Sequence, residues 1–224
     1  AVTLVENEKT RVIDASTAHR TLPGWSYGFP ELSRGHCISV KEGRRVAVPG
    51  CHAGGFCALV YPLVASGIMP ADYPVVSYSV TGYTGGGKAM IAQYEAEDRA
   101  AAFSSPRQYA LSQQHKHLKE MKAVCGLENI PFFAPIVADF PRGMVVSVPI
   151  MPRLLRQTHD KNSLRAFFTG YYAGKRLITV ATEEMETAQN GFLAANALAG
   201  KDGIELFVMG NDERIQLCAR FDNL

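Results

Sequence analysis

Five apolar segments of strand length crowd the second half of the sequence, and they constrain the fold more than any other feature. They are FFAPIVADF from residue 132, GMVVSVPIM from 143, LITVAT from 177, GIELFVMG from 203 and RIQLCARF from 214. Short runs rich in Val, Ile and Phe, bounded by Gly or Pro, are typical of β-strands. Asn211 and Asp212 between the last two segments predict a hairpin turn.

Helical patterns lie mainly before and between these segments. Apolar residues at positions 56, 59, 60, 63 and 64 share one helix face, which predicts a helix after Gly50 that Gly67 and Pro70 close. Pro62 lies inside it and is expected to kink it or to remove one hydrogen bond. Helices are also predicted over 88–102 and 117–125, and after Ser163 as N-cap. Helices on one face of a mostly antiparallel sheet fit this order, so the predicted fold class is α+β.

Charge and apolar patterning exclude several functional classes. The 224 residues contain 23 basic and 21 acidic side chains. This near balance predicts no excess of positive charge of the kind that binds nucleic acid or an anionic membrane. The longest apolar stretch, residues 55–69, contains Pro62 and is too short to cross a bilayer. With no secretory signal at its start, the chain is expected in the cytoplasm. Because it begins at Ala1 rather than Met, it is also expected to be a piece of a longer protein.

The number and spacing of the cysteines argue against disulfide bonds and against a structural metal site. The sequence has five cysteines, an odd number without a spacing pattern, and this disfavours a disulfide framework. No CxxC is present, so no metal site is predicted.

Cys51 is the candidate nucleophile. It follows Pro49-Gly50 at a strand-to-helix junction, where free backbone N–H groups and the helix dipole are expected to stabilise a thiolate and lower its pKa. The same N–H groups are suited to an oxyanion hole. The alternative is a small buried apolar side chain, the usual role of a lone cysteine.

Two histidines, His115 and His117, are candidate partners for this cysteine. Histidine titrates near neutral pH and serves nucleophilic cysteines as acid or base. A solvated surface pair is the alternative. No third metal ligand stands at a suitable spacing, which disfavours zinc.

A glycine-rich loop with a lysine, Gly82–Lys88, follows a predicted strand and precedes a predicted helix. It nearly spells a phosphate-binding P-loop, but Ala89 stands where that loop needs Ser or Thr for magnesium. A glycine-rich turn with a lysine still suits a phosphate or carboxylate. Arg20 and Glu31 are weaker candidates: the guanidinium for an anionic substrate, the carboxylate to order it.

Together these residues resemble the N-acetyl-gamma-glutamyl-phosphate reductases of the shorter, second type. The matching segments are VIDASTAHR, YGFPEL, VPGCHAGGF, GYTGGGK, HKHLKEM and FDNL, in the family's order along the whole chain. The sequence departs from the family pattern at His52, Gly54 and Lys119, where Tyr, Thr and Pro are usual.

The resemblance implies a fold and a domain plan. Residues 21–224 are similar to the catalytic and dimerisation domain that these enzymes share with glyceraldehyde-3-phosphate and aspartate-semialdehyde dehydrogenases. Residues 1–20 are similar to the end of a Rossmann-like dinucleotide-binding domain, most of which is missing. The resemblance also implies a homodimer or homotetramer, and a chain that is inactive alone because its cofactor domain is absent.

The resemblance further implies a reaction and roles for residues. Cys51 attacks a small-molecule acyl phosphate, expels phosphate and forms a thioester, and NADPH reduces this to N-acetylglutamate 5-semialdehyde in arginine biosynthesis. His115 is implied as the acid/base at the developing oxygen. The residues implied in binding are Lys88, Arg20, Glu31 and His117 for the substrate, and Gly85 and Gly86 near the cofactor or substrate phosphate.

Three alternatives stay open from the sequence. A sister enzyme of the aspartate-semialdehyde dehydrogenase type uses the same thiol chemistry on another acyl phosphate. A phosphate- or nucleotide-binding module would use the Gly82–Lys88 loop without redox chemistry. A fragment that mainly dimerises would bury a face of the strand-rich second half.

Overall fold

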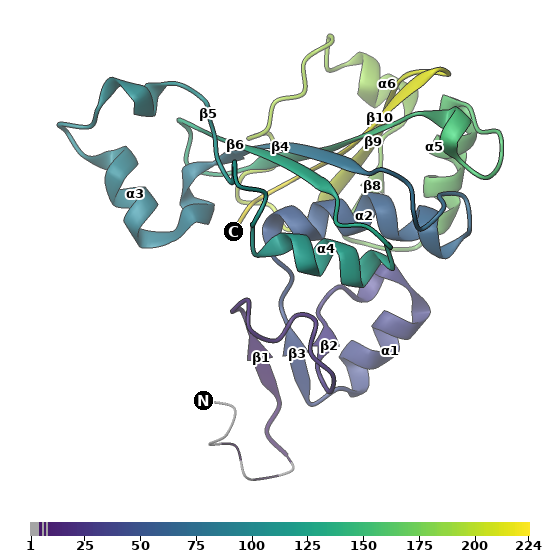
Figure 1. Ribbon diagram of the computed structural model, residues 1–224, viewed down its shortest axis with the longest axis horizontal. Coiled ribbons are helices and arrows are strands. Elements are labelled where there is room, and N and C mark those ends of the chain that lie inside the picture. The colour runs from purple at the N-terminus through teal and green to yellow at the C-terminus, as the bar shows by residue number, and fades with distance from the viewer. Residues whose placement is uncertain (1–4, 6, 8) are drawn as a thin grey trace.

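The computed structural model describes residues 5, 7 and 9–224. It consists of a large sheet with its two central helices packed against one face, a short helix on the other face, and a smaller sheet beyond the central helices (Figure 1). The expected domain remnant at residues 1–20 falls partly outside the described residues.

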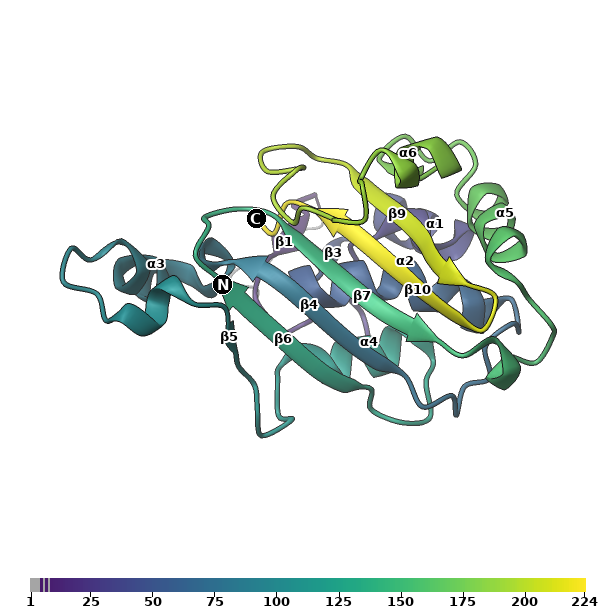
Figure 2. The same ribbon diagram turned by 90° about the horizontal axis from the view of Figure 1, so that it is seen from above.

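The large sheet has seven strands in the order β5-β6-β4-β7-β10-β9-β8, seen from above in Figure 2. The strands are β4 (Val76–Gly82), β5 (Arg107–Gln108), β6 (Phe132–Ala138), β7 (Met144–Ile150), β8 (Ile178–Val180), β9 (Ile204–Asn211) and β10 (Arg214–Phe221). Four of the six neighbouring pairs are antiparallel, and β4–β6 and β8–β9 are parallel. The five segments named from the sequence are all strands here, and β9 and β10 form the predicted hairpin. The predicted α+β class, with a mostly antiparallel sheet, is confirmed.

The small sheet is parallel and is built from the first part of the chain. Its order is β1 (Val12–Asp14), β3 (Arg45–Ala47), β2 (Ser26–Tyr27), and helix α1 (Arg34–Glu42) connects β2 to β3. Strand β1 lies before residue 20 and strands β2 and β3 lie after it, so the small sheet contains strands from both of the predicted segments, 1–20 and 21–224.

The helices around the large sheet are α2 (Cys51–Ala65), α3 (Gly87–Glu95), α4 (His117–Cys125), α5 (Lys161–Tyr171) and α6 (Glu183–Thr187), with 3₁₀ turns at Pro30–Leu32, Tyr83–Gly86, Ala101–Ser104 and Pro152–Leu154. Helices α2 and α4 cover one face of the large sheet, α3 and α5 lie at its ends, and α6 packs on the opposite face, where Met185 contacts the cluster of Val145, Phe207 and Cys218 (Figures 1 and 2). The predicted helix 117–125 is confirmed to the residue, and α2 runs through Pro62 to Ala65.

Two helix ends differ from the prediction. Helix α3 ends at Glu95 rather than near residue 102, because Ala96 is extended and the Arg99 guanidinium bonds the Tyr94 carbonyl and Asp139, which turns the chain back. Helix α5 begins earlier than expected. Asp160 is its N-cap and accepts the backbone N–H of Ser163 at 2.6 Å, while Ser163 Oγ accepts the N–H of Asp160, a capping box.

Helix α2 is the centre of the fold and positions the site. It is apolar on most sides because it lies between the large sheet and the elements beneath it, and Phe56, Leu59 and Leu63 are fully or almost fully buried. At Gly55 an added Cβ would lie 2.6 Å from the Phe221 ring and 2.8 Å from Val146, so only glycine permits this approach of helix to sheet. The tight fit fixes the N-terminus of α2, and with it Cys51, at the junction of the two sheets.

Candidate active site

Cys51 lies between two cavities. It is the first residue of α2, after the N-cap Gly50, and its side chain is partly exposed. One cavity, of about 430 Å³, has mainly polar lining and contains the histidines. The other, of about 280 Å³, is mainly apolar and lies against Gly28, Phe29 and Gly54. A nucleophile shared by two cavities can meet one reactant from each side.

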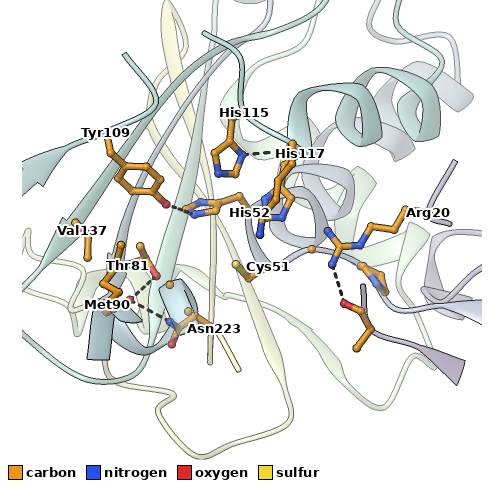
Figure 3. A pocket seen from close by; sticks show the side chains of 17 residues that line it. Arg20, Cys51, His52, Thr81, Met90, Tyr109, His115, His117, Val137 and Asn223 are labelled. Atoms are coloured by element: carbon orange, nitrogen blue, oxygen red, sulfur yellow. Dashed lines mark hydrogen bonds between the residues drawn. The ribbon is translucent and has the colours of Figure 1, made fainter. Parts of the chain in front are cut away.

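The polar cavity brings distant segments together around Cys51 (Figure 3). Among the described residues, Arg20 and Lys116 are the charged side chains that line it, and no carboxylate of this part of the chain does. A cavity of this charge favours an anionic ligand. Its lining residues are Ala15, Arg20, Pro49, Gly50, Cys51, His52, Thr81, Gly82, Gly85, Gly86, Met90, Tyr109, His115, Lys116, His117, Val137 and Asn223.

The two predicted histidines are both in this cavity, with different exposure. His117 opens α4 and is 3% exposed, whereas His115 is partly exposed. The backbone N–H of His117 donates to Nδ1 of His115 at 3.2 Å. A neutral His115 therefore carries its proton on Nε2 and can donate it. Of the two, His115 is the one placed to exchange a proton with a ligand.

A third histidine, His52, is buried beside Cys51 and bonded at both ring nitrogens. Its Nδ1 is 2.9 Å from Ser79 Oγ and its Nε2 is 2.6 Å from the Tyr109 hydroxyl. Its ring centre is 5.8 Å from that of His115 and 5.5 Å from that of His117. This network holds Tyr109 in the cavity wall (Figure 3).

All three imidazoles are neutral at physiological pH. Burial lowers the pKa of His52 to about 3, of His115 to about 4 and of His117 to about 2, with smaller contributions from the neighbouring histidines, Lys116 and Arg20. Neutral histidines are hydrogen-bond donors and weak bases, so the thiol does not face an imidazolium in the free protein.

The expectation that the helix N-terminus lowers the pKa of Cys51 is wrong for the free protein. Burial raises the pKa of this thiol, and it outweighs the backbone N–H groups of His52 and Cys51 and the charges of Lys116 and Arg20, which all favour the thiolate. The helix N-terminus acts as expected in sign, but desolvation is larger.

A pH profile of alkylation tests this balance. We expect the reaction of Cys51 with iodoacetamide to rise mainly above pH ~8.5, the ordinary range of a thiol, because burial disfavours the thiolate. Peptide mass spectrometry at each pH measures the rate, with the exposed Cys37 as internal reference for the reagent. A plateau at Cys51 already reached below pH 7 would contradict the raised pKa.

The other predicted site residues divide between the cavity and its exterior. Arg20, Gly85 and Gly86 line the polar cavity. Lys88 is exposed on α3 and Glu31 lies in the 3₁₀ turn Pro30–Leu32, and neither lines this cavity. The glycine-rich loop forms the 3₁₀ turn Tyr83–Gly86, and Lys88 follows it at the start of α3.

Several residues that the structure brings to the site had no role predicted from the sequence. Glu120, Tyr109, Lys116 and Asn223 are the main ones. One signal was available for Glu120: it stands three residues after His117 in a predicted helix, so both face the same side. Tyr109 lies just after a short strand within a segment that reads as irregular, and no periodicity points to it.

The described residues include neither a cluster that could hold a metal nor a helix that could span a membrane. No group of three or more His, Cys, Asp or Glu side chains in this part of the chain is arranged to hold a metal ion. None of the described helices is long and apolar enough to cross a membrane.

Comparison of the sequence with known proteins identifies the family to which the chain belongs. Residues 51–223 match the family model described as the semialdehyde dehydrogenase dimerisation domain. A Brucella anthropi protein named N-acetyl-gamma-glutamyl-phosphate reductase is 44% identical over 228 residues, covering 100% of this chain and 73% of that protein. The chain belongs to the N-acetyl-gamma-glutamyl-phosphate reductase family. A Brucella ovis protein of the same name is 42% identical with the same coverage. The reductase family is a family of oxidoreductases, and the chain belongs to that class of enzyme.

Solved structures share the fold of this reductase-family chain at low sequence identity. Aspartate semialdehyde dehydrogenase from Francisella tularensis has a TM-score of 0.67 at 13% identity, covering 95% of this chain and 70% of that one. The type II enzyme from Vibrio cholerae has a TM-score of 0.67 at 16% identity, covering 95% and 67%. The likeness extends the fold of the reductase family to the aspartate semialdehyde dehydrogenases.

Proposed function

We propose that this chain provides the catalytic site for the reduction of N-acetyl-gamma-glutamyl phosphate to N-acetylglutamate 5-semialdehyde and phosphate, a step of arginine biosynthesis. The observation that carries the proposal is Cys51 at the meeting point of a cationic cavity and an apolar cavity. The relatives' name supplies the substrate, and the cavities supply a place for each reactant.

The polar cavity suits the acyl phosphate. Its two cations, Arg20 and Lys116, attract a substrate that carries a phosphate and a carboxylate. We propose these two residues as the anion-binding groups. Lys88 and Glu31, expected at the substrate, lie outside this cavity. Gly85 and Gly86 give the substrate room, since their backbone faces the cavity without a side chain.

Cys51 is proposed as the nucleophile of the first step. Its sulfur bonds to the acyl carbon, the bond from that carbon to the phosphate oxygen breaks, and the thiol proton leaves with the phosphate. The developing oxyanion faces His115, which donates from Nε2 in the tautomer fixed by the N–H of His117. Proton exchange at this oxygen is the role proposed for His115.

The apolar cavity suits a nicotinamide ring. A nicotinamide cofactor, when bound, supplies the hydride that reduces the thioester carbon. Gly28, Phe29 and Gly54 would hold the ring against Cys51. A Cβ at Gly28 would lie 2.8 Å from the Ala47 carbonyl, so glycine lets this part of the wall pack closely on β3. We propose NADP as the cofactor, with its remaining contacts in a dinucleotide-binding domain that includes residues 1–20.

Assembly and location complete the proposal. The family model concerns dimerisation, and we propose a homodimer or homotetramer in the cytoplasm. The face of the large sheet that does not pack on α2 exposes Val76 and Phe132, neighbours on β4 and β6, as an interface would require.

Trapping the thioester tests the first half of the reaction. We expect the chain, incubated with N-acetyl-gamma-glutamyl phosphate without nicotinamide and quenched in acid, to carry an acyl group on Cys51 and to release phosphate. Peptide mass spectrometry reads the adduct, and exposed Cys37 serves as the control thiol. Acylation of Cys37 as extensive as that of Cys51 would refute a dedicated nucleophile. Aspartyl phosphate as competitor separates this substrate from that of the structural neighbours.

A further inference from the structure

A single buried carboxylate, Glu120 of α4, connects the elements that build the site. It is 2% exposed and accepts three hydrogen bonds from groups far apart in the sequence. The donors are the Gly50 backbone N–H at 2.9 Å, the Tyr27 hydroxyl at 2.9 Å and Arg20 Nη1 at 3.1 Å. A buried carboxylate that accepts three hydrogen bonds, one of them from a guanidinium, is stabilised because its negative charge is both paired and hydrogen-bonded.

The two oxygens of Glu120 have different tasks. Oε1 accepts from Gly50 and from Tyr27, and thereby ties the N-cap of α2 to α4. Oε2 accepts from Arg20 alone. One oxygen therefore fixes the helix that carries Cys51, and the other fixes the guanidinium in the cavity wall.

Arg20 is held at further points, which leaves its orientation no freedom. Its Nε donates to the Val48 carbonyl at 2.9 Å, and Nη2 lies 3.4 Å from the Ala15 carbonyl. Figure 3 shows Arg20 at the edge of the cavity. Its side chain is 9% exposed, and that exposed part faces the polar cavity. Arg20 thus lies beside Cys51 with its positive charge partly neutralised by its ion pair with Glu120.

We propose that Glu120 is the positioning residue of this site: it orients Arg20 toward the polar cavity, offsets the guanidinium charge beside Cys51, and ties the first turn of α2 to α4. The inference rests on the proposed function only for the identity of the substrate. The geometry of the buried carboxylate stands without it, so its test uses no substrate.

The variant Glu120→Gln tests the role of Oε2 separately from that of Oε1. Its amide oxygen keeps an acceptor for Gly50 and Tyr27, while its NH₂ group replaces the acceptor for Arg20. The guanidinium charge is then no longer offset, and the thiolate of Cys51 gains stability. We expect the midpoint of Cys51 alkylation by iodoacetamide to move to lower pH by on the order of one unit. The charged and titratable groups that line the two cavities beside Cys51 are Arg20, Lys116, His52, His115, His117 and Tyr109 in the polar cavity and Asp222 in the apolar one.

Two further variants, a double variant and a charge control, complete the experiment. The double variant with Arg20→Gln removes the charge that Glu120 offsets, and its midpoint is expected to return to within a few tenths of the parent's. Glu128→Gln, an exposed carboxylate just beyond α4, removes the same charge elsewhere and is expected to leave the midpoint unchanged. A loss of packing alone would not be reversed by the second substitution.

The outcomes are distinct. An unshifted midpoint in Glu120→Gln, or a shift that persists in the double variant, would overturn the proposal. Should Glu120→Gln fail to fold by circular dichroism, Arg20→Gln alone leaves the carboxylate unpaired, and the midpoint then moves to higher pH. An unshifted Arg20→Gln would overturn the proposal as well. Failure of the thioester trap with these shifts intact would refute the proposed substrate and leave Glu120 in place.

Discussion

The Cys51→Ser variant is expected to lose phosphate release from N-acetyl-gamma-glutamyl phosphate by about 10⁴-fold or more. A serine hydroxyl is far less acidic than a thiol, and the cavity holds no base strong enough to activate it. The pKa of His52 is lowered to about 3, that of His115 to about 4 and that of His117 to about 2. The raised pKa of Cys51 does not weaken this argument, because a neutral thiol still ionises far more readily than a hydroxyl.

The measurement is phosphate release together with the intact mass of the chain. Cys37→Ser is the matched control, since it makes the same atom exchange at an exposed cysteine of α1, away from both cavities. The control should release phosphate at the parent rate. Residual release in Cys51→Ser within tenfold of the parent rate would mean that another group opens the acyl phosphate.

Sequence patterns predicted the elements whose information is local. Helix α4 and the β9–β10 hairpin follow from propensity, caps and turn residues. The prediction for α5 missed its start because Asp160 and Ser163 form a reciprocal pair, and the sequence alone does not say which of them caps the helix. Helix α3 was predicted too long because Arg99 turns back to Asp139, a contact 40 residues away in sequence.

The site could be predicted only as a set of residue types. Cys51, His115, His117 and Arg20 carry chemistry that a motif can indicate, and the structure brings all four to one cavity. The sign of the Cys51 pKa shift depends on burial, which comes from the packing of α2 and not from its N-terminal position. Lys88 was predicted to face a phosphate because it follows glycines, but the 3₁₀ turn Tyr83–Gly86 leaves it exposed outside the cavity.

Gly50→Ala has the second-largest expected effect, and it acts through volume alone. The backbone of Gly50 has φ −73° and ψ 145°, which alanine adopts without strain. The added methyl group, however, would meet Nε2 of His117 and Nη1 of Arg20 closer than any carbon atom can approach them. The His117 ring is buried and has little room to move, and Arg20 cannot turn away without breaking its contacts to Glu120 and Val48.

We therefore expect Gly50→Ala to acylate Cys51 about 10²-fold more slowly, because displacement of the cavity wall by about 1 Å misaligns the reacting groups. Its free energy of unfolding in urea should fall by about 1–3 kcal/mol from overpacking. Gly170→Ala is the control, since its Cβ would enter open space on α5 and alanine is the better helix former by about 1 kcal/mol. Parent-like acylation by Gly50→Ala would show that His117 and Arg20 move freely, and the argument that Glu120 fixes this wall would fail with it.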